Sequence, residues 1–136
     1  EGELRELGFS LSLNHNSRNA IGTQRKEVAQ KIADELHVIC VLKGHRTLIA
    51  APQQSVRVAS ILVDFNGGSE LATAGSGDIL AGLIGAFLAS WKPLTYSDAQ
   101  RVVRDAVHLH SAAGAHAARA KKSVVATDIL ESLAYC

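Results

Sequence analysis

The sequence is poor in aromatic residues, cysteine, proline and methionine. Of its 136 residues, 4% are aromatic, two are cysteines, two are prolines and none is methionine. Because 47% of the residues are still hydrophobic, a core must be built from Ala, Val, Leu and Ile. Cys40 lies inside an apolar run and Cys136 is the last residue, so the cysteines form no disulfide framework. Their pattern indicates a reducing, cytoplasmic setting.

The sequence has no excess of charge of one sign and no long hydrophobic run. Lys and Arg number 14 against 13 acidic residues, a net charge of +1 that gives no electrostatic case for nucleic acid or an anionic membrane. The longest apolar run, residues 79–89, is too short to span a bilayer, and residues 1–8 do not resemble a signal peptide. We therefore expect no nucleic-acid partner and no membrane association, while a homo-oligomer is left open.

Hydrophobic patterning predicts alternating helices and strands, the pattern of an α/β fold. Strands are expected over residues 38–42, 47–51 and 56–63, with a turn at 52–55 and the last two strands paired antiparallel. Helices are expected over residues 3–8, 27–36, 79–91, 96–118 and 127–133. Thr23 or Ser17 is expected to cap the second of these helices, and Thr127 the last.

Two of these elements carry further expectations. The run Val38–Leu42 is apolar throughout, which is typical of a strand covered on both faces in a parallel sheet. The helix over residues 79–91 is so apolar that we expect burial on nearly all sides. Gly82 and Gly85 lower its helix propensity and are expected to permit close backbone packing.

The most informative segment is the run from Asn66 to Asp78, N-G-G-S-E-L-A-T-A-G-S-G-D. A loop of small residues that opens a helix presents backbone N–H groups and the positive end of the helix dipole, which favour an anion such as phosphate. A carboxylate at Asp78, in the first helical turn, has a purpose if it accepts a proton from a hydroxyl that attacks the phosphate. In so short a pattern taken alone, the commoner outcome is structural: Asp78 complements the dipole, and Gly75 and Gly77 allow a tight turn.

Lys43 is the second candidate for anion binding. It follows an apolar strand and precedes Gly44 and the polar run His45–Thr47, at the strand end where open α/β sheets bind ligands. Taken alone, a hairpin with Lys43 and Arg46 in water is a slightly better interpretation. Together with the loop before Asp78, Lys43 places two anion-binding elements on one edge of the sheet.

Two other chemistries are not favoured. His108, His110 and His116 do not have the spacing of a helical metal site, so no metal ligand is assigned, and His110 is expected to be a packed helix residue near a nucleotide. Ser76 lies between two glycines but lacks the second spacer residue of a nucleophile elbow, which argues against a hydrolase.

Residues 42–52, L-K-G-H-R-T-L-I-A-A-P, and 71–82, L-A-T-A-G-S-G-D-I-L-A-G, resemble the ADP/ATP-dependent NAD(P)H-hydrate dehydratases of the ribokinase-like superfamily. Residues 109–114 and 126–130 match the same family, and residues 2–8 resemble its segment after a His-containing loop. The resemblance implies a ribokinase-like three-layer α/β/α fold, with residues 1–136 as the C-terminal portion of the domain. The family's N-terminal half is then missing, so we expect this piece alone to be poorly folded and inactive.

The resemblance also implies an activity, the removal of water from hydrated NADH and NADPH coupled to hydrolysis of ADP or ATP. It implies nucleotide contacts by Lys43, Gly44, His45, Arg46, Thr47, Gly68, Thr73, Ala74, Gly75, Ser76 and Gly77. Asp78 would contact the hydrated substrate and act as the catalytic base. Mg²⁺ is expected with the phosphates, although no protein ligand can be assigned.

Two alternatives remain open at this point. A ribokinase-like kinase that phosphorylates a vitamin-precursor alcohol would use the same loop chemistry. A non-catalytic nucleotide-binding remnant would also keep the two anion-binding elements, but a binder needs no base at Asp78.

Overall fold

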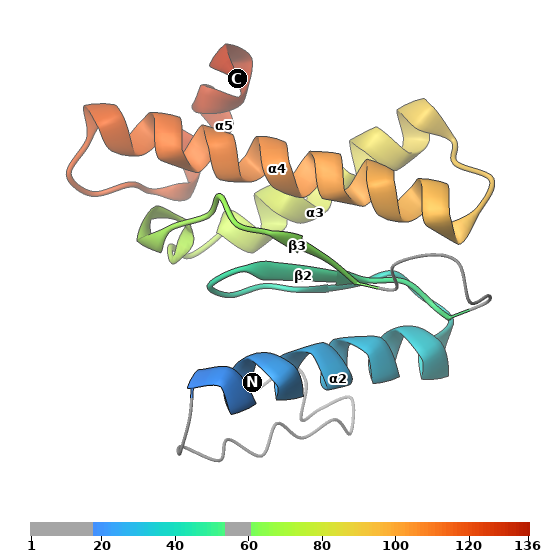
Figure 1. Cartoon of the computed structure of the whole chain (residues 1–136). Coiled ribbons are helices and arrows are strands. Elements are labelled where there is room, and N and C mark those ends of the chain that lie inside the picture. The colour runs from blue at the N-terminus through green and yellow to red at the C-terminus, as the bar shows by residue number, and fades with distance from the viewer. Residues whose placement is uncertain (1–17, 54–60) are drawn as a thin grey trace.

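The computed structural model describes residues 18–53 and 61–136, which form three layers (Figure 1). The middle layer is a sheet of β1 (Cys40–Leu42), β2 (Thr47–Ala50) and β3 (Ile61–Asp64). Helix α2 (Arg18–Leu36) covers one face, and α3 (Ser76–Trp91) and α4 (Tyr96–Ala120) cover the other. The 3₁₀ turn η1 (Ser69–Leu71) precedes α3, while α5 (Ala126–Ser132) and the 3₁₀ turn η2 (Leu133–Tyr135) pack on α4. The predicted α/β/α layering is confirmed.

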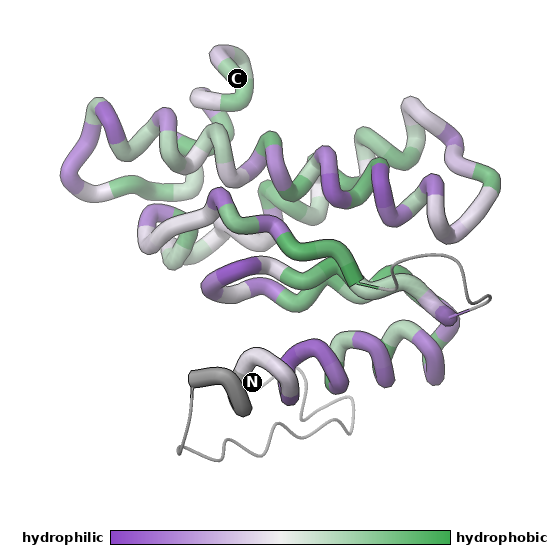
Figure 2. Tube along the Cα trace, viewed as in Figure 1, coloured by the Kyte–Doolittle hydropathy of each residue, from purple (hydrophilic) through white to green (hydrophobic). Residues whose placement is uncertain are grey.

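The alternation of side chains along β2 explains the layers. Leu48 and Ala50 face α2, where they meet Ala29 and Ala33, while Ile49 faces the other helices. The helices on that second face contribute Leu80, Val103 and Val107 to the core. Small alanines on α2 let that helix approach the sheet closely. In Figure 2 the strands form the most continuously hydrophobic part of the chain, as a sheet covered on both faces requires.

The prediction of a parallel sheet is wrong for the strands described. The order is β1-β2-β3, and both pairs are antiparallel, with Leu42 opposite Leu48 and Thr47 opposite Asp64. The predicted antiparallel pairing of the second and third strands is confirmed. The apolar run before Lys43 indicates only that both faces of β1 are covered. An antiparallel strand between two helical layers is covered in the same way.

Several helix ends differ from the predictions. Helix α2 begins at Arg18, so Thr23 lies inside it and does not cap it. Helix α5 begins at Ala126, and the carboxylate of Asp128 accepts the Val125 N–H, so Thr127 is not the cap. Ser17, the helix predicted over residues 3–8, the turn at 54–55 and the strand residues 56–60 lie outside the described residues.

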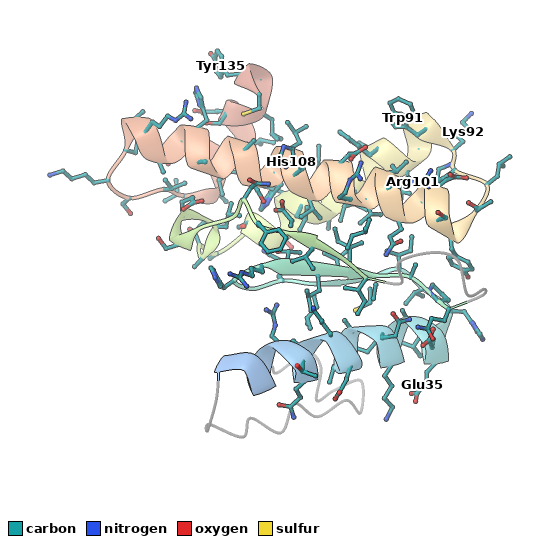
Figure 3. The ribbon with its side chains drawn as sticks, viewed as in Figure 1. Glu35, Trp91, Lys92, Arg101, His108 and Tyr135 are labelled. Carbon is teal, nitrogen blue, oxygen red and sulfur yellow. The ribbon has the colours of Figure 1, made fainter. Side chains whose placement is uncertain are left out.

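Helix α3 is less enclosed than its composition predicts. Its buried residues are Ser76 and Leu80, and Trp91 is 72% exposed and projects outward (Figure 3). A Cβ built on Gly82 or Gly85 meets no atom within 4 Å, so neither glycine serves close packing among the described residues. Across residues 18–53 and 61–136, every helix falls short of the length and hydropathy that crossing a bilayer requires.

Gly85→Ala should therefore stabilise the chain. The position is helical, exposed and free of neighbours, so the substitution removes only the conformational cost of glycine. We expect the free energy of unfolding to rise by about 0.5–1 kcal/mol, measured by urea denaturation. Gly114→Ala is the contrast, because a Cβ there overlaps the side chain of Leu71, and it should destabilise. A loss of stability in Gly85→Ala would contradict an open face on α3.

Candidate functional site

A cavity of about 530 Å³ opens at the end of the sheet where β1 turns into β2. Its rim includes Lys43, Gly44, His45, Thr47 and Gly68, all predicted from the sequence. Its floor is apolar and is supplied by Leu71, Leu80 and Val107. Five predicted binding residues that are up to 25 positions apart in the sequence thus meet around one space of ligand size.

Ser76, the first residue of α3, joins the two predicted anion-binding elements. The Lys43 ammonium donates to the Ser76 hydroxyl, with Nζ 3.5 Å from Oγ. On the other side, His110 Nε2 donates to the Ser76 carbonyl oxygen at 3.0 Å. Ser76 and His110 are both buried, at 0% and 1% exposure. The sequence placed Lys43 and the loop on one edge, and the structure confirms that they are adjacent.

His110 serves this junction as a neutral donor. Burial lowers the pKa of His110, the hydrogen bond to the Ser76 carbonyl opposes that effect, and the charge of Lys43 reinforces it. The net pKa lies below the usual value near 6.5, so the imidazole is uncharged at neutral pH. The prediction of a packed helix residue is confirmed for His110.

The turn that opens α3 depends on Gly75. Its φ of +81° is left-handed, and a Cβ there would lie 3.1 Å from the Cβ of Ala126. The Ser76 amide donates to the Thr73 carbonyl, and the Asp78 amide donates to the Gly75 carbonyl. Fewer amides are therefore available than a fully open helix start would offer. Attraction for an anion depends mainly on the Lys43 charge and the helix dipole.

Asp78 lies in the first turn of α3 with its side chain exposed. It does not line the cavity described above, and it is two residues beyond Ser76, so the two side chains leave the helix in different directions. The exposed carboxylate is accessible to a substrate that approaches the helix start from outside the chain.

The remaining predicted residues are distributed around this centre. Gly77 adjoins Lys43, whose Nζ would lie 3.5 Å from a Cβ at Gly77. Arg46 does not line the cavity, and its guanidinium lies 5.4 Å from the ring centroid of Phe65. Thr73 lines a second hollow of about 500 Å³ beside Lys121, and the exposed Ala74 lines neither.

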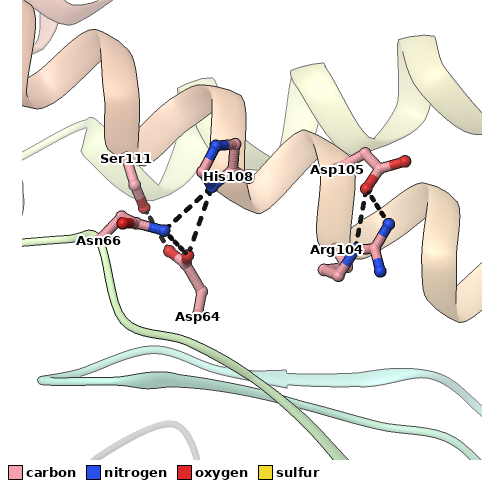
Figure 4. Close-up of polar contacts among 6 residues, drawn as sticks. All are labelled: Asp64, Asn66, Arg104, Asp105, His108 and Ser111. Carbon is pink, nitrogen blue, oxygen red and sulfur yellow. Dashed lines mark hydrogen bonds and ion pairs between the residues drawn. The ribbon is translucent and has the colours of Figure 1, made fainter.

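A buried carboxylate that the sequence analysis missed contacts Ser111, which lines the cavity, and Figure 4 shows its polar contacts. Asp64, at the end of β3, is 6% exposed and accepts hydrogen bonds from Ser111 Oγ at 2.6 Å and Asn66 Nδ2 at 2.9 Å. His108 Nδ1 is 3.8 Å from the same carboxylate. Because it accepts from Ser111 of α4 and from Asn66 of the loop after β3, Asp64 connects that helix to that loop. A lone Asp at a strand end was the only sequence signal.

Asp64 should make stability depend on pH. Burial by itself raises the pKa of Asp64, but the hydrogen bonds from Ser111 and Asn66, with the charge of His108, outweigh burial, and the net pKa is lowered. A folded-state pKa below the unfolded value near 3.9 means that the ionised group stabilises at higher pH. That contribution is lost as the pH falls through the folded-state pKa.

We expect Asp64→Asn to lower the free energy of unfolding by about 1–3 kcal/mol at pH 7, with the gap to the parent narrowing below about pH 4. Asp105→Asn is the control, since Asp105 forms an exposed pair with Arg104 and should cost less than about 1 kcal/mol (Figure 4). Denaturant unfolding at both pH values gives the comparison. Equal losses in the two variants would show that the Asp64 cluster has no special role.

The region that matches known proteins includes all of the site residues described above. The chain matches the family model described as NAD(P)H-hydrate dehydratase over residues 8–134. It is 32% identical over 123 residues to the ADP-dependent (S)-NAD(P)H-hydrate dehydratase of Lactococcus lactis subsp. lactis, covering 90% of this chain and 42% of that protein. It is 34% identical over 117 residues to the bifunctional NAD(P)H-hydrate repair enzyme Nnr of Moorella thermoacetica, covering 85% of this chain and 20% of that protein.

Solved structures agree with the sequence matches. The ADP/ATP-dependent NAD(P)H-hydrate dehydratase of Bacillus subtilis, co-crystallised with ATP and Mg²⁺, superposes with a TM-score of 0.68 at 27% identity. That match covers 86% of this chain and 39% of the other. A ribokinase-like superfamily protein of Enterococcus faecalis superposes with a TM-score of 0.56 at 26% identity, over 90% of this chain and 37% of the other. The chain spans less than half the length of each of these relatives. The chain has a ribokinase-like fold and belongs to the NAD(P)H-hydrate dehydratase family.

Proposed function

We propose that this chain provides the nucleotide-binding and base-bearing part of an enzyme that removes water from hydrated NADH and NADPH and consumes ADP or ATP. The observation that carries the proposal is the contact between Lys43 and the first residue of α3 beside a cavity with an apolar floor. A cation, a helix start and an apolar floor suit the phosphates and the adenosine of a nucleotide. The names of the relatives supply the substrate class.

In this proposal the nucleotide places its phosphates at Lys43 and the helix start, and its adenosine against Leu71, Leu80 and Val107. Gly44, His45, Thr47 and Gly68 form the rim. Arg46, Thr73, Ala74, Gly75 and Gly77 complete the proposed contacts, from the neighbouring turn and loop.

Asp78 is the proposed base. Its carboxylate accepts the proton of the hydroxyl on the hydrated nicotinamide ring, whose oxygen then attacks the terminal phosphorus of the nucleotide. The bond from that phosphorus to the rest of the nucleotide breaks, and charge on the transferred group is stabilised by Lys43 and the helix start. Phosphate then leaves from the ring carbon with loss of a neighbouring proton, which restores the ring double bond. Phosphorylation thus converts a poor leaving group into a good one.

Mg²⁺ accompanies nucleotide phosphates in this type of chemistry. Within the residues that the structure describes, no three His, Cys, Asp or Glu side chains converge on a metal site. In this proposal Mg²⁺ would be held mainly by phosphate oxygens and water, and it would neutralise phosphate charge.

The relatives are longer than the region matched here, which bears on the substrate site. We propose that the nicotinamide part of the site belongs largely to the region of the relatives that this chain does not match, and that the 136 residues alone lack turnover.

The free thiols of Cys40 and Cys136 are consistent with a reducing, cytoplasmic setting.

Turnover of hydrated NADH by the complete protein tests the function. With ADP or ATP present, the absorbance of NADH should return and inorganic phosphate should be released in equal amount. A stable phosphorylated product from a small alcohol, with no recovery of NADH, would replace the dehydratase by a kinase of the same fold. Nucleotide binding without either product would indicate a non-catalytic binder.

Asp78→Asn should abolish most turnover while leaving nucleotide binding intact. Loss of a general base costs about 10²–10⁴-fold in kcat, and an exposed side chain outside the cavity should change the nucleotide Kd little. Asp98→Asn is the matched control, because Asp98 is also an exposed carboxylate in a first helical turn, where it pairs with Thr95. Steady-state kinetics and calorimetry give both values. Parent-like turnover in Asp78→Asn would remove Asp78 from the mechanism.

A further inference from the structure

The β1–β2 turn, residues 43–46, is held by a side chain from a different layer of the fold. Arg25 of α2 donates from Nη1 to the His45 carbonyl at 2.8 Å, and from Nη2 to the carbonyls of Leu42 and Lys43 at 3.3 Å each. Figure 1 shows the first half of α2 below this turn. One guanidinium thus contacts three carbonyl oxygens in the stretch that carries Lys43.

The backbone of this turn needs such support. Gly44 has φ +145°, and Arg46, which is not a glycine, has φ +62°. A left-handed non-glycine residue is disfavoured by about 1–2 kcal/mol, so the surroundings must hold it. A Cβ on Gly44 would lie 2.8 Å from Arg25 Nη2, which shows how closely the guanidinium lies against the turn. The fork geometry of arginine suits several fixed acceptors, whereas a lysine offers a single point charge.

The position of four residues of the cavity rim depends on the turn that Arg25 contacts. Lys43, Gly44, His45 and Thr47 all line the cavity, and their backbone belongs to the turn or adjoins it. Arg25 does not line the cavity itself. Arg25 therefore acts on a ligand there through the turn or through its charge, and Arg25→Lys separates the two effects.

We propose that Arg25 is a positioning residue for the nucleotide: it fixes the β1–β2 turn so that Lys43 is already directed at the start of α3 before the phosphates bind. This inference rests on the proposed nucleotide site. A preorganised turn avoids the cost of ordering Lys43 on binding, so the benefit appears in nucleotide affinity. The chemical step, which depends on Asp78, is left largely unaffected.

The test compares Arg25→Lys and Arg25→Gln with Lys26→Gln, which removes a charge from the next, exposed residue of α2. In the complete protein without nucleotide, amide hydrogen exchange over residues 43–47 should accelerate in both Arg25 variants and not in the control. With ADP or ATP, the nucleotide KM and Kd should rise about tenfold in both Arg25 variants, with kcat within about threefold of the parent. Arg25→Lys should not rescue binding, because it keeps the charge and loses the fork.

Three results with the Arg25 variants would each overturn the inference. Parent-like affinity in Arg25→Lys would show that charge alone suffices. Faster exchange with unchanged ADP affinity would show that the turn does not position the nucleotide. Unchanged exchange in both variants would show that Arg25 does not hold the turn. If the Arg25 variants do not fold, Gly44→Ala displaces the guanidinium instead, and an unchanged ADP affinity there would also overturn it.

The same experiment separates this inference from the proposed function. If the parent protein restores no NADH, yet ADP binding weakens in both Arg25 variants, the dehydratase proposal fails and Arg25 remains a positioning residue. If NADH is restored at the parental KM in both variants, the dehydratase proposal stands and the role of Arg25 is rejected.

Discussion

The placement of Ser76 is the constraint on which the rest of the site depends. This fully buried residue begins α3, and it is contacted by Lys43 from the end of β1 and by His110 from the middle of α4. Holding the first residue of the helix holds the positive end of its dipole in place. The positive end of α3 and the ammonium of Lys43 therefore act on the same point, and neither can shift without breaking a contact to Ser76.

The charges around the cavity are distributed unevenly, with the positive charge at the Lys43 end. Next to the exposed Lys43, His110 is kept neutral mainly by burial, so this end carries the lysine charge without a positive charge on His110. The negative charge of Asp64 is compensated by hydrogen bonds from Ser111 and Asn66. In the proposed site, an anionic ligand would be attracted to the Lys43 end, and the apolar floor would take its uncharged part. The orientation of such a ligand would follow from charges that the fold holds in place.

Local patterns in the sequence were sufficient to locate the two elements that meet at Ser76 and that we propose bind an anion. Glycines before an apolar helix mark a tight helix start, and a lysine after an apolar strand marks the edge of a sheet, so Gly75, Ser76 and Lys43 could be predicted. Arg25 and Asp64 could not, because their partners lie 17–20 and up to 47 positions away in the sequence. A polar residue on a helix or at a strand end carries no local sign of its tertiary partner. The same reason explains the parallel-sheet error, since an apolar run does not reveal the direction of its neighbour.

Helical geometry separates the two chemical tasks assigned to the start of α3. Successive helical residues are rotated by about 100°, so Ser76 and Asp78 project from different sides of the same turn. Ser76 faces inward to Lys43 and His110, while Asp78 is exposed on the side where Gly82 and Gly85 leave the helix uncovered. A phosphate held at the inner side and an acceptor that arrives from the exposed side would therefore meet at the end of the helix. In that arrangement the hydroxyl of the substrate would lie between the Asp78 carboxylate and the terminal phosphate, so the carboxylate could take the proton from outside the cavity.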